Sequence, residues 1–353
     1  MKAGIAGAGI MGKMLAFMLL NAGWEVVLFD QDKQRNCSMA AAGLLTPVAE
    51  LEKNDLIIFQ LGMESIKQHW HEVIAQLSNP VYFKQTGSLV LSHPREKVEL
   101  ARFVQIISSK LNNDAYYKKL NRYEVQKLEP EVSKFQEGYY FPDEGQVDNQ
   151  MLLTELELFL IKKNITWFKD TFVCDIQPRK IILKDCTQTF DLVLDCRGLG
   201  AKSSFKDLRG LRGELIWLHA PDVSISRPVR FLHPRYSLYL VPRPDQTYII
   251  GASEIESNDE TSISVRTTLE LLTAAYYVHP AFCEARVLKT ITHCRPTLPH
   301  HLPRIKYSDG FIAVNGLYRH GFLIAPALAT EVMRWISKGI TAIEYPQLWE
   351  KYI

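Results

Sequence analysis

The 353-residue sequence lacks features that would place it in a specialised class. No stretch reaches the roughly 18 uninterrupted apolar residues that a membrane-spanning helix needs. No internal repeat or low-complexity linker divides the chain. The formal net charge is only +2, so there is no general attraction to nucleic acid or to a membrane surface. We therefore expect a globular protein without nucleic-acid binding or a membrane span, and 47% hydrophobic residues can form a sizeable core.

The sequence also has little that could bind a metal or form a disulfide framework. Its six cysteines include no Cys-x-x-Cys pair and no ligand-like spacing to a histidine: Cys37, Cys174, Cys186, Cys196, Cys283 and Cys294. His300 and His301 follow Pro299, which is typical of a loop rather than a metal site. We expect no metal, and reduced thiols in a cytoplasmic protein.

Residues 2–30 have the pattern of a dinucleotide-binding unit. A short apolar strand is expected at Lys2–Ala6, followed by the glycine-rich turn Gly7–Gly12 and a helix over Lys13–Ala22. A second strand, Glu25–Phe29, ends at Asp30. Strand, glycine turn, helix, strand and terminal acid in this order are far more specific than a glycine triplet alone.

Each glycine of this unit has a physical role. Gly7 permits a tight turn, Gly9 lets the backbone approach a pyrophosphate, and Gly12 lets the helix pack closely against the strand. The pyrophosphate would lie at the positive end of the helix, and Asp30 would hold the hydroxyls of the adenosine ribose. Nicotinamide-dependent dehydrogenases begin with the same pattern, so it leaves NAD and FAD open.

Strand-like and helix-like segments fill the middle of the chain. Strands are expected at Gly87–Ser92, Phe190–Asp195, Glu214–His219, Leu238–Val241 and Thr247–Gly251. Helices are expected at Met63–Leu77, Arg95–Leu111, Arg122–Leu128, Gln150–Lys162 (capped by Asp148 or Asn149) and Ser264–Val278. A second glycine turn, Cys196–Gly200, follows one of these strands.

The last part of the chain separates the two cofactors. A strand is expected at Gly310–Val314, then a glycine-rich turn at Asn315–Gly321 and a helix over Pro326–Ser337. This segment brings a second helix N-terminus to the nucleotide-binding sheet. A flavin needs such a group, because two-electron reduction leaves negative charge at N1 and the C2 carbonyl, which a helix N-terminus stabilises. A nicotinamide has no such need, so the pattern favours FAD.

Taken in order, these segments resemble the D-amino-acid oxidase family of FAD-dependent oxidoreductases, and within it the glycine oxidases of thiamine biosynthesis. The resemblance is nearly full-length, and only residues 50–120 match loosely. It rests on the glycine fingerprint and on a set of short motifs: Ala40–Gly43, Leu128–Pro130, Gly145–Asn149, Gly210–Glu214, Tyr239–Arg243, Gly251-Ala252, Cys294–Pro296 and Asn315–Ala327.

The resemblance implies an α/β chain, α+β overall, built from two parts. A Rossmann-like FAD-binding domain of the glutathione-reductase type would be assembled from residues 1–45, 140–210 and 295–353. A substrate domain with a mixed sheet would be inserted between these segments, from residues 46–139 and 211–294.

The resemblance also implies roles for residues at the cofactor. The ADP half of FAD would be bound by Gly7, Gly9, Gly12 and Asp30, with Val173 beside the adenine. Residues of three turns would line the flavin or donate N–H groups to it: Ala41, Ala42, Gly43, Leu44, Gly198, Gly321, Phe322 and Leu323. No cysteine occupies residues 315–323, and His320 is the one residue there that could form a covalent link. We therefore expect non-covalent FAD.

Three further side chains would handle an amino-acid substrate. Arg295 matches the family's carboxylate-binding arginine, Tyr239 its tyrosine partner, and Arg319 a second arginine beside the substrate amine. The chemistry agrees, since a guanidinium holds a carboxylate through two parallel charge-assisted hydrogen bonds. Because both arginines are cationic, they would disfavour a protonated amine, and activity should rise with pH.

Two places depart from the glycine-oxidase pattern. Ser237 and Leu238 stand where bulkier polar or thiol residues occur near the pocket mouth, which leaves the size of the substrate open. Glu254 adds a carboxylate that we expect at the rim or in solvent. If it faced inward, it would favour a substrate with an extra amine.

These features predict FAD-dependent oxidative deamination of a small amino acid such as glycine or sarcosine. Hydride would pass from the α-carbon to flavin N5, and the imine would be hydrolysed or used in thiazole synthesis. The expected partners are the amino acid, oxygen or another electron acceptor, and the thiazole synthase machinery, with a homo-oligomer left open. The alternatives are a D-amino-acid dehydrogenase with a non-oxygen acceptor, an NAD-dependent dehydrogenase, and a flavin-binding module without catalysis.

Overall fold

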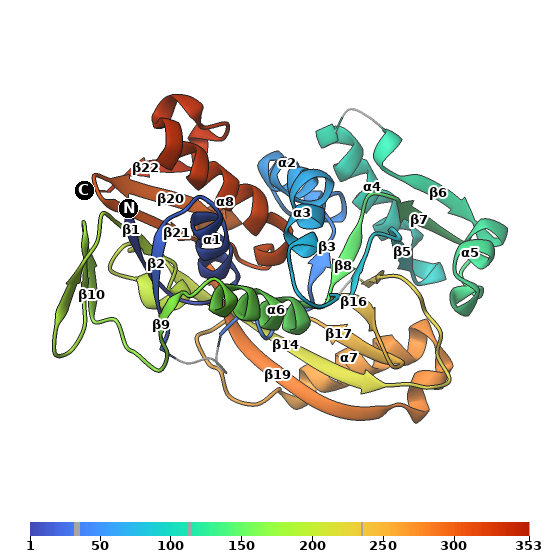
Figure 1. Ribbon diagram of the computed structural model, residues 1–353. Coiled ribbons are helices and arrows are strands. Elements are labelled where there is room, and N and C mark those ends of the chain that lie inside the picture. The colour runs from blue at the N-terminus through green and yellow to red at the C-terminus, as the bar shows by residue number, and fades with distance from the viewer. Residues whose placement is uncertain (32–35, 112–113, 234–235, 353) are drawn as a thin grey trace.

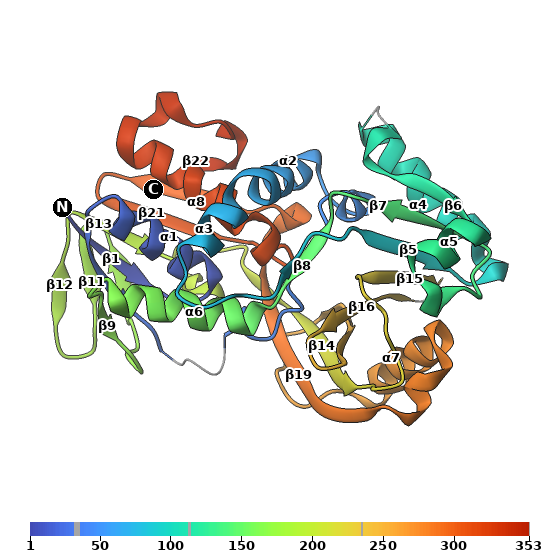
Figure 2. The same ribbon diagram turned by 45° about the vertical axis from the view of Figure 1, so that its right-hand side comes forward.

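The fold contains two large β-sheets that lie side by side, each with helices packed on it (Figure 1). The computed structural model describes residues 1–31, 36–111, 114–233 and 236–352. Both termini lie at the outer end of the part that contains the first sheet (Figures 1 and 2). Among the described residues, no helix combines the length and apolar character needed to cross a bilayer. All six cysteines lie within the described ranges, and none of them forms a disulfide.

The first sheet has seven strands in the order β22-β20-β21-β13-β1-β2-β9. They come from distant parts of the chain: β1 (Lys2–Ala6), β2 (Glu25–Phe29), β9 (Thr166–Phe168), β13 (Leu192–Asp195), β20 (Arg304–Ser308), β21 (Phe311–Asn315) and β22 (Trp349–Lys351). The run from β21 to β9 is parallel. Its central strands are covered on both faces, which is why their sequences are almost wholly apolar. The predictions for β1 and β2 are confirmed to the residue.

The carboxyl ends of these parallel strands meet at one edge of the sheet. β1 ends before Gly7, β2 before Asp30, β13 before Cys196, and β21 at Asn315. Ligands of open parallel sheets bind at this edge, where the loops leave the strands. The glycine turn, the acid after the second strand and the carboxy-terminal turn therefore come together, although they are far apart in the sequence.

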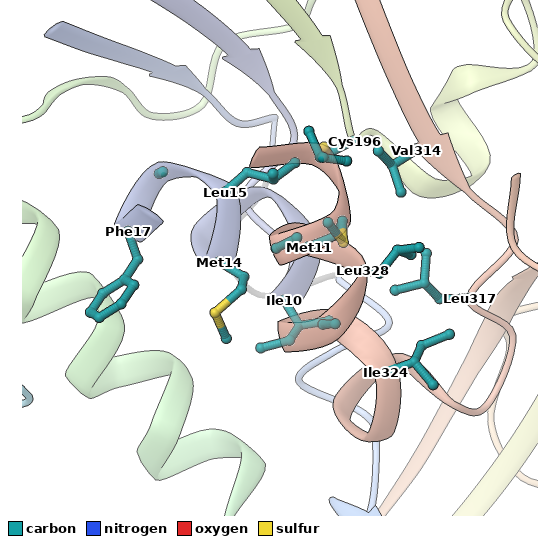
Figure 3. Packing of buried hydrophobic residues seen from close by; sticks show 14 of the residues in the cluster. Ile10, Met11, Met14, Leu15, Phe17, Cys196, Val314, Leu317, Ile324 and Leu328 are labelled. Atoms are coloured by element: carbon teal, nitrogen blue, oxygen red, sulfur yellow. The ribbon is translucent and has the colours of Figure 1, made fainter. Parts of the chain in front are cut away.

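Three helices pack on this sheet and on one another: α1 (Ile10–Asn21), α6 (Asn149–Lys162) and α8 (Gly321–Lys338). Figure 3 shows Ile10 and Met11 on the side of α1 that faces α8, and Phe17 on the side that faces α6. The Phe17 ring lies 4.6 Å from that of Phe159 on α6, measured between centroids. This contact is part of the packing that places α1, and with it the glycine turn, beside α6.

Helix α8 begins at Gly321, so the prediction that it starts at Pro326 is wrong. Proline is favoured in the first turn of a helix because it has no N–H to donate. Here Pro326 lies inside the helix, and its missing N–H leaves the Phe322 carbonyl without its usual partner. Trp70 Nε1 donates to that carbonyl at 3.1 Å. The helix can therefore extend through the proline because a side chain from another element replaces the lost bond.

The second sheet has nine strands in the order β18-β14-β17-β16-β15-β5-β7-β6, with β19 also paired to β14. Their bounds are β5 (Ser88–Ser92), β6 (Lys118–Asn121), β7 (Glu137–Phe141), β14 (Arg209–His219), β15 (Val229–His233), β16 (Tyr236–Arg243), β17 (Thr247–Gly251), β18 (Ile255–Glu256) and β19 (Arg286–Thr297). β5 and β15 are parallel and the other pairs antiparallel, so the sheet is mixed, as expected. The strand β19 was not predicted. Figure 2 shows β14 and β19 leading from the first part of the molecule into the second.

Two small sheets complete the strands, in the orders β3-β8-β4 and β10-β11-β12. Their strands are β3 (Leu44–Leu45), β4 (Phe83–Lys84), β8 (Gly145–Val147), β10 (Asp175–Gln177), β11 (Lys180–Ile182) and β12 (Thr187–Thr189). The pairing of β3 with β8 is the one that matters for the site, because it fixes the loop that precedes β3.

The remaining helices are α2 (Leu56–Glu64), α3 (Trp70–Ala75), α4 (Lys97–Leu111), α5 (Arg122–Leu128) and α7 (Val265–Val278). The predictions for α4 to α7 are confirmed within a few residues. Asp148 caps α6 by accepting from the Met151 N–H at 2.9 Å, as predicted. The helix predicted from residue 63 instead begins as α2 at Leu56, which Asp55 caps.

Helices α2 and α3 pack into the apolar core that also contains α1 and α8. Ile58, Leu61 and Trp70 are fully buried there. The predicted division placed residues 46–139 with the substrate domain, but these helices make their apolar contacts with the nucleotide-binding part. The domain boundaries themselves stay a prediction.

Candidate active site

A cavity of about 860 Å³ lies between the two large sheets. The carboxyl edge of the first sheet, the loop before β3, the start of α8 and one face of the second sheet form its wall. Every residue predicted to bind cofactor or substrate lines it, apart from Gly12, Gly43 and Val173. The structure therefore brings residues from both ends of the chain and from its middle to one place.

The glycine turn forms one end of this wall. Gly7 has φ +97°, and a Cβ added to it would lie 2.4 Å from the Cys196 carbonyl oxygen. A Cβ on Gly12 would lie 1.8 Å from the Gly7 carbonyl oxygen, so the absence of a side chain at Gly12 lets the helix pack directly against the turn. No side chain caps α1 at Gly9, and the Ile10 N–H donates to Ser38 Oγ at 3.0 Å. The positive end of α1 thus faces the cavity, and a ligand can come close to the backbone there.

Asp30 lines the same wall beyond the glycine turn, where its Oδ1 accepts from the Ala8 N–H at 3.2 Å. Val173 was predicted beside the adenine, yet its side chain is only 5% exposed and packs in the core. Its carbonyl accepts from Arg197 Nη1 at 3.3 Å, and Arg197 is the residue that lines the cavity. Any contact of Val173 with the adenine would therefore come from its backbone.

The loop before β3 lines the middle of the cavity with Ala41, Ala42 and Leu44. Gly43 has φ +60°, and a Cβ there would lie 1.9 Å from the Val147 carbonyl oxygen, so the loop rests directly on β8. Arg243 of β16 holds both pieces, donating to the carbonyls of Ala42 at 2.5 Å and Val147 at 3.0 Å. Burial lowers the pKa of Arg243 to about 10, which still leaves it cationic at neutral pH.

The start of α8 faces the cavity with Gly321, Phe322 and Leu323. The first N–H groups of a helix have no partner within it, and the side chain of the N-cap residue here, His320, does not accept from them. His320, the residue before the helix, is 2% exposed, and its Nε2 lies 3.1 Å from Asn54 Oδ1. Burial lowers the pKa of His320 to about 3, so the ring is neutral.

These groups fit FAD. The glycine turn and α1 offer a positive helix end and a bare backbone for a pyrophosphate. Asp30 offers an acceptor for ribose hydroxyls, and the uncapped start of α8 offers donors for the flavin C2 carbonyl. Gly198, with φ +56°, also lines this part, and its carbonyl accepts from Asn315 Nδ2 at 2.8 Å.

One face of the second sheet forms the other end of the cavity. Side chains of paired residues in neighbouring strands point to the same face. Tyr239 pairs with Gly251, which pairs with Leu215. On the next strand Arg295 pairs with Leu211, four residues before Leu215 and therefore on the same face. The register alone thus directs Tyr239 and Arg295 to one side.

Two glycines make room for these side chains. A Cβ on Gly213 would lie 2.2 Å from Arg295 Nη2, and a Cβ on Gly251 would lie 2.9 Å from the Tyr239 ring. Arg295 Nη1 donates to the Ser253 carbonyl at 3.1 Å. Within the described residues, no carboxylate forms an ion pair with Arg295. A guanidinium with donors left over and no counter-ion is suited to bind a carboxylate.

Comparison with known proteins decides the cofactor. The family described as FAD dependent oxidoreductase (DAO) matches residues 2–335. The chain belongs to this family. It is therefore an FAD-dependent oxidoreductase, with the predicted fold of a nucleotide-binding part and a mixed-sheet part. The NAD-dependent alternative, which rested on the first strands alone, is wrong.

Relatives of this FAD-dependent oxidoreductase cover nearly its whole length. A protein of Rhizobium etli named as a thiamine biosynthesis oxidoreductase, ThiO, is 34% identical over 335 residues, 94% of each chain. The bifunctional protein ThiO/ThiG of Nostoc sp. is 23% identical over 92% of this chain, which spans 51% of that protein. The crystal structure of glycine oxidase from Geobacillus kaustophilus has a TM-score of 0.85 at 20% identity, over 98% of this chain and 97% of that one. That structure shows the fold.

Arg319 of this oxidoreductase is held by two carboxylates. Its Nε and Nη2 each lie 2.7 Å from Glu50 Oε2, and its Nη1 lies 3.6 Å from Glu254 Oε2. Arg230 on β15 approaches the other oxygen of Glu50 at 3.6 Å. Burial by itself raises the pKa of Glu50, but the positive charges of Arg319 and Arg230 lower it to about 2. Glu50 and Glu254 thus offset the charge of Arg319, whereas Arg295 has no carboxylate partner in the described chain.

Two expectations about the pocket mouth change. Glu254 faces inward and lines the cavity, where it accepts from the Tyr318 hydroxyl, instead of pointing into solvent. Leu238 does not lie near the mouth: it is 1% exposed and packs on the opposite face of the sheet from Tyr239, because neighbouring strand residues alternate. The side chain of Ser237 lies outside the described part of the structure.

Sequence reasoning missed Glu50, Arg230 and Ser38. Glu50 lies in the 3₁₀ turn Ala49–Glu52, which no pattern predicted. Arg230 did carry a signal, since it alternates with Val229 and Phe231, which are buried. That alternation places Arg230 on the Tyr239 face, but its meaning depends on Glu50, which comes from another part of the chain.

Proposed function

We propose that this FAD-dependent oxidoreductase oxidises a small amino acid, glycine or an N-substituted glycine such as sarcosine, at the carbon next to the amine. The observation that carries the proposal is Arg295. It is a guanidinium without a carboxylate partner in the described chain, lying over Gly213 beside Tyr239 in the FAD-binding cavity. The name of the Geobacillus structure, a glycine oxidase, supports the same substrate class, and the name of the Rhizobium relative supports a role in thiamine biosynthesis.

Each residue has a distinct task in this proposal. Arg295 binds the substrate carboxylate through its remaining donors, and Tyr239 provides a hydroxyl beside it. Arg319, held by Glu50, lies next to the substrate amine. When bound, FAD accepts the two electrons and the hydrogen removed from the α-carbon. The protein itself orients the amine and excludes water, and no side chain must take up a proton from carbon.

The product follows from the balance of the reaction. Loss of two electrons and two protons from the amino acid gives an imine, and water converts the imine to an oxo acid and ammonia. An imine that is not hydrolysed would serve thiazole synthesis, which the fused ThiO/ThiG relative supports. Oxygen is the proposed electron acceptor.

Anaerobic mixing of the purified yellow protein with a panel of amino acids tests the proposal. We expect bleaching of the flavin absorbance by glycine or sarcosine, and fast reoxidation on admitting oxygen. Bleaching only by bulky D-amino acids would contradict the substrate class. Reoxidation by a quinone but not by oxygen would instead favour the dehydrogenase alternative.

A further inference from the structure

Glu254 lies in the wall of the cavity, where three segments of the chain meet. It follows β17, and its side chain is 32% exposed. Its Oε1 accepts from the hydroxyl of Tyr318, in the turn before α8, and its Oε2 lies 3.7 Å from Lys53 Nζ. Tyr318 and Lys53 both line the cavity, and Lys53 is 47% exposed. The contacts on both oxygens hold the carboxylate in place in the cavity wall, with Lys53 and Arg319 as its cationic neighbours.

The substrate end of the cavity has charged side chains of both signs close together. Arg295 lies on the sheet face without a carboxylate partner in the described chain, and it contacts the carbonyl of Ser253, the residue before Glu254. Arg319 lies between them, with Nη1 3.6 Å from Glu254 Oε2 and its own charge offset by Glu50. A substrate whose carboxylate is bound to Arg295 extends towards Arg319 and Glu254.

We propose that Glu254 is a specificity-determining residue that excludes substrates carrying a second carboxylate. The inference rests on the proposed function, since Arg295 is taken as the site of the first carboxylate. A second carboxylate on the amine substituent would approach Glu254, and repulsion of like charges in a partly buried site lowers affinity about tenfold or more. A hydrogen or a methyl group at the same position has no such penalty. The pocket thus selects glycine and sarcosine over compounds such as iminodiacetate.

The test uses the holoenzyme and the variant Glu254→Gln. Glutamine keeps the shape of the side chain and an oxygen that accepts from Tyr318, but it removes the charge. We expect the native enzyme to favour sarcosine over iminodiacetate in kcat/KM. In E254Q the value for iminodiacetate should rise about tenfold or more, while that for sarcosine changes less than about threefold.

Two further variants show whether the effect belongs to this carboxylate. Glu256→Gln removes a charge two residues further on, where the side chain is 65% exposed and lies 3.2 Å from Arg209 rather than in the cavity. It should leave the preference unchanged. Lys53→Met removes the cation beside Glu254 and should shift the preference further against iminodiacetate. Thermal unfolding and FAD content of each variant show that it is folded.

A binding measurement separates this inference from the proposed reaction. Acetate and malonate are titrated into the oxidised holoenzyme, and the change in flavin absorbance reports occupancy without turnover. E254Q should bind malonate about tenfold more tightly than native enzyme does, with little change for acetate. If no amino acid reduces the flavin but this shift occurs, the proposed reaction fails and the role of Glu254 stands. The role of Glu254 is wrong if native enzyme treats compounds with one and with two carboxylates alike. It is also wrong if E254Q changes neither the sarcosine-to-iminodiacetate ratio of kcat/KM nor the acetate-to-malonate ratio of affinity. If neither anion binds, both proposals fall.

Discussion

Individual residues act in this site as much by being small as by being charged. Gly213 and Gly251 leave the space that the Arg295 guanidinium and the Tyr239 ring occupy. A side chain at either glycine would meet these groups at 2.2 to 2.9 Å, closer than nonbonded atoms approach. The position of the charged group is therefore set by a neighbour that contributes no functional atom.

Replacing Arg295 by alanine should lower kcat/KM for glycine or sarcosine strongly. Removing one partner of a hydrogen-bonded charge pair in a buried site costs about 2–5 kcal/mol. FAD content should stay the same, because Arg295 belongs to the second sheet, whereas the glycine turn follows a strand of the first. Arg286→Ala, at the exposed end of the same strand, is the control and should behave like native enzyme. Normal kinetics of Arg295→Ala on every carboxylate substrate would show that the arginine is only structural.

The rate of flavin reduction should rise with pH between about pH 6 and 10 and follow the substrate amine. Glu50, with a pKa of about 2, is ionised throughout this range, and His320, with a pKa of about 3, stays neutral. Burial raises the pKa of Tyr239 above its ordinary value, so it keeps its proton over most of the range. Since Glu50 offsets Arg319, the pocket lowers the amine pKa less than two free arginines would. Stopped-flow reduction under anaerobic conditions measures this, and a flat profile would contradict it.

Glu144 should make stability depend on pH. The side chain is fully buried, accepts from the Ala49 N–H at 2.7 Å and contacts the Ser88 hydroxyl. Burial raises its pKa to about 7. Because the folded pKa exceeds the unfolded value of about 4.3, the contribution of Glu144 to stability is complete below about pH 4 and is lost as the pH rises to 7.

Glu144→Gln keeps an acceptor for Ala49 and a donor for Ser88 but does not titrate. The free energy of unfolding of the variant, relative to native protein, should therefore grow by about 3 kcal/mol from about pH 4.5 to 7. Urea denaturation at a series of pH values measures the difference. Glu72→Gln, on the exposed side of α3, is the control and should show no such trend. A constant difference for Glu144→Gln would mean that folding does not raise the pKa of this carboxyl.

Among the elements, α8 depends on a neighbour for its first turns. Pro326 removes one helical hydrogen bond, and Trp70 of α3 supplies the missing donor to Phe322. A second contact, from the Ala327 N–H to Ser65 Oγ at 3.1 Å, holds the next turn. These bonds position the uncapped start of the helix at the cavity.

Trp70→Phe should destabilise the protein by about 1–3 kcal/mol, because the Phe322 carbonyl then stays buried without a donor. In a Pro326→Ala background an N–H is restored at residue 326, and the same substitution should cost less. A double-mutant cycle on thermal or urea unfolding measures the coupling. Equal costs in both backgrounds would show that Trp70 stabilises α8 by packing alone.

For the whole molecule, the cavity lies where the two sheets meet, and its lining comes from the start, the middle and the end of the chain. A ligand that binds only the folded state stabilises it by about 4 kcal/mol at a thousandfold excess over its Kd. Removal of FAD should therefore lower the unfolding temperature, and added FAD should restore it. NADH should have no effect.

The same preparation tests whether FAD is bound without a covalent link. Both ring nitrogens of His320 face other groups, Nε2 at 3.1 Å from Asn54 and Nδ1 at 3.6 Å from Glu50. Denaturation should release yellow FAD into the supernatant and leave a colourless protein precipitate. A yellow precipitate would show a covalent flavin.

Local patterns predicted the elements whose sequence signals lie within the element itself. β1 and β2 are continuous apolar strands, and α6 begins at the cap Asp148, so their bounds were close or identical to those found. The start of α8 was missed because Trp70, from a distant helix, compensates for a proline. β19 was missed because its first five residues, Arg286–Thr290, are exposed and do not alternate between apolar and polar, while the strand forms by pairing with the distant β14.

The sequence by itself determined the dinucleotide fold, which depends on residue types at fixed spacing, such as the glycines that a tight turn and a close pyrophosphate require. It favoured FAD through the turn and helix near its end, and Arg295 followed from its resemblance to the D-amino-acid oxidase family. Only the tertiary structure decided how the charges of the site are paired: that Glu50 offsets Arg319, that Arg295 has no carboxylate partner in the described chain, and that Glu254 faces inward. Ion pairing falls steeply with distance, and Glu50 and Arg319 become neighbours only after the chain has folded the two sheets against one cavity.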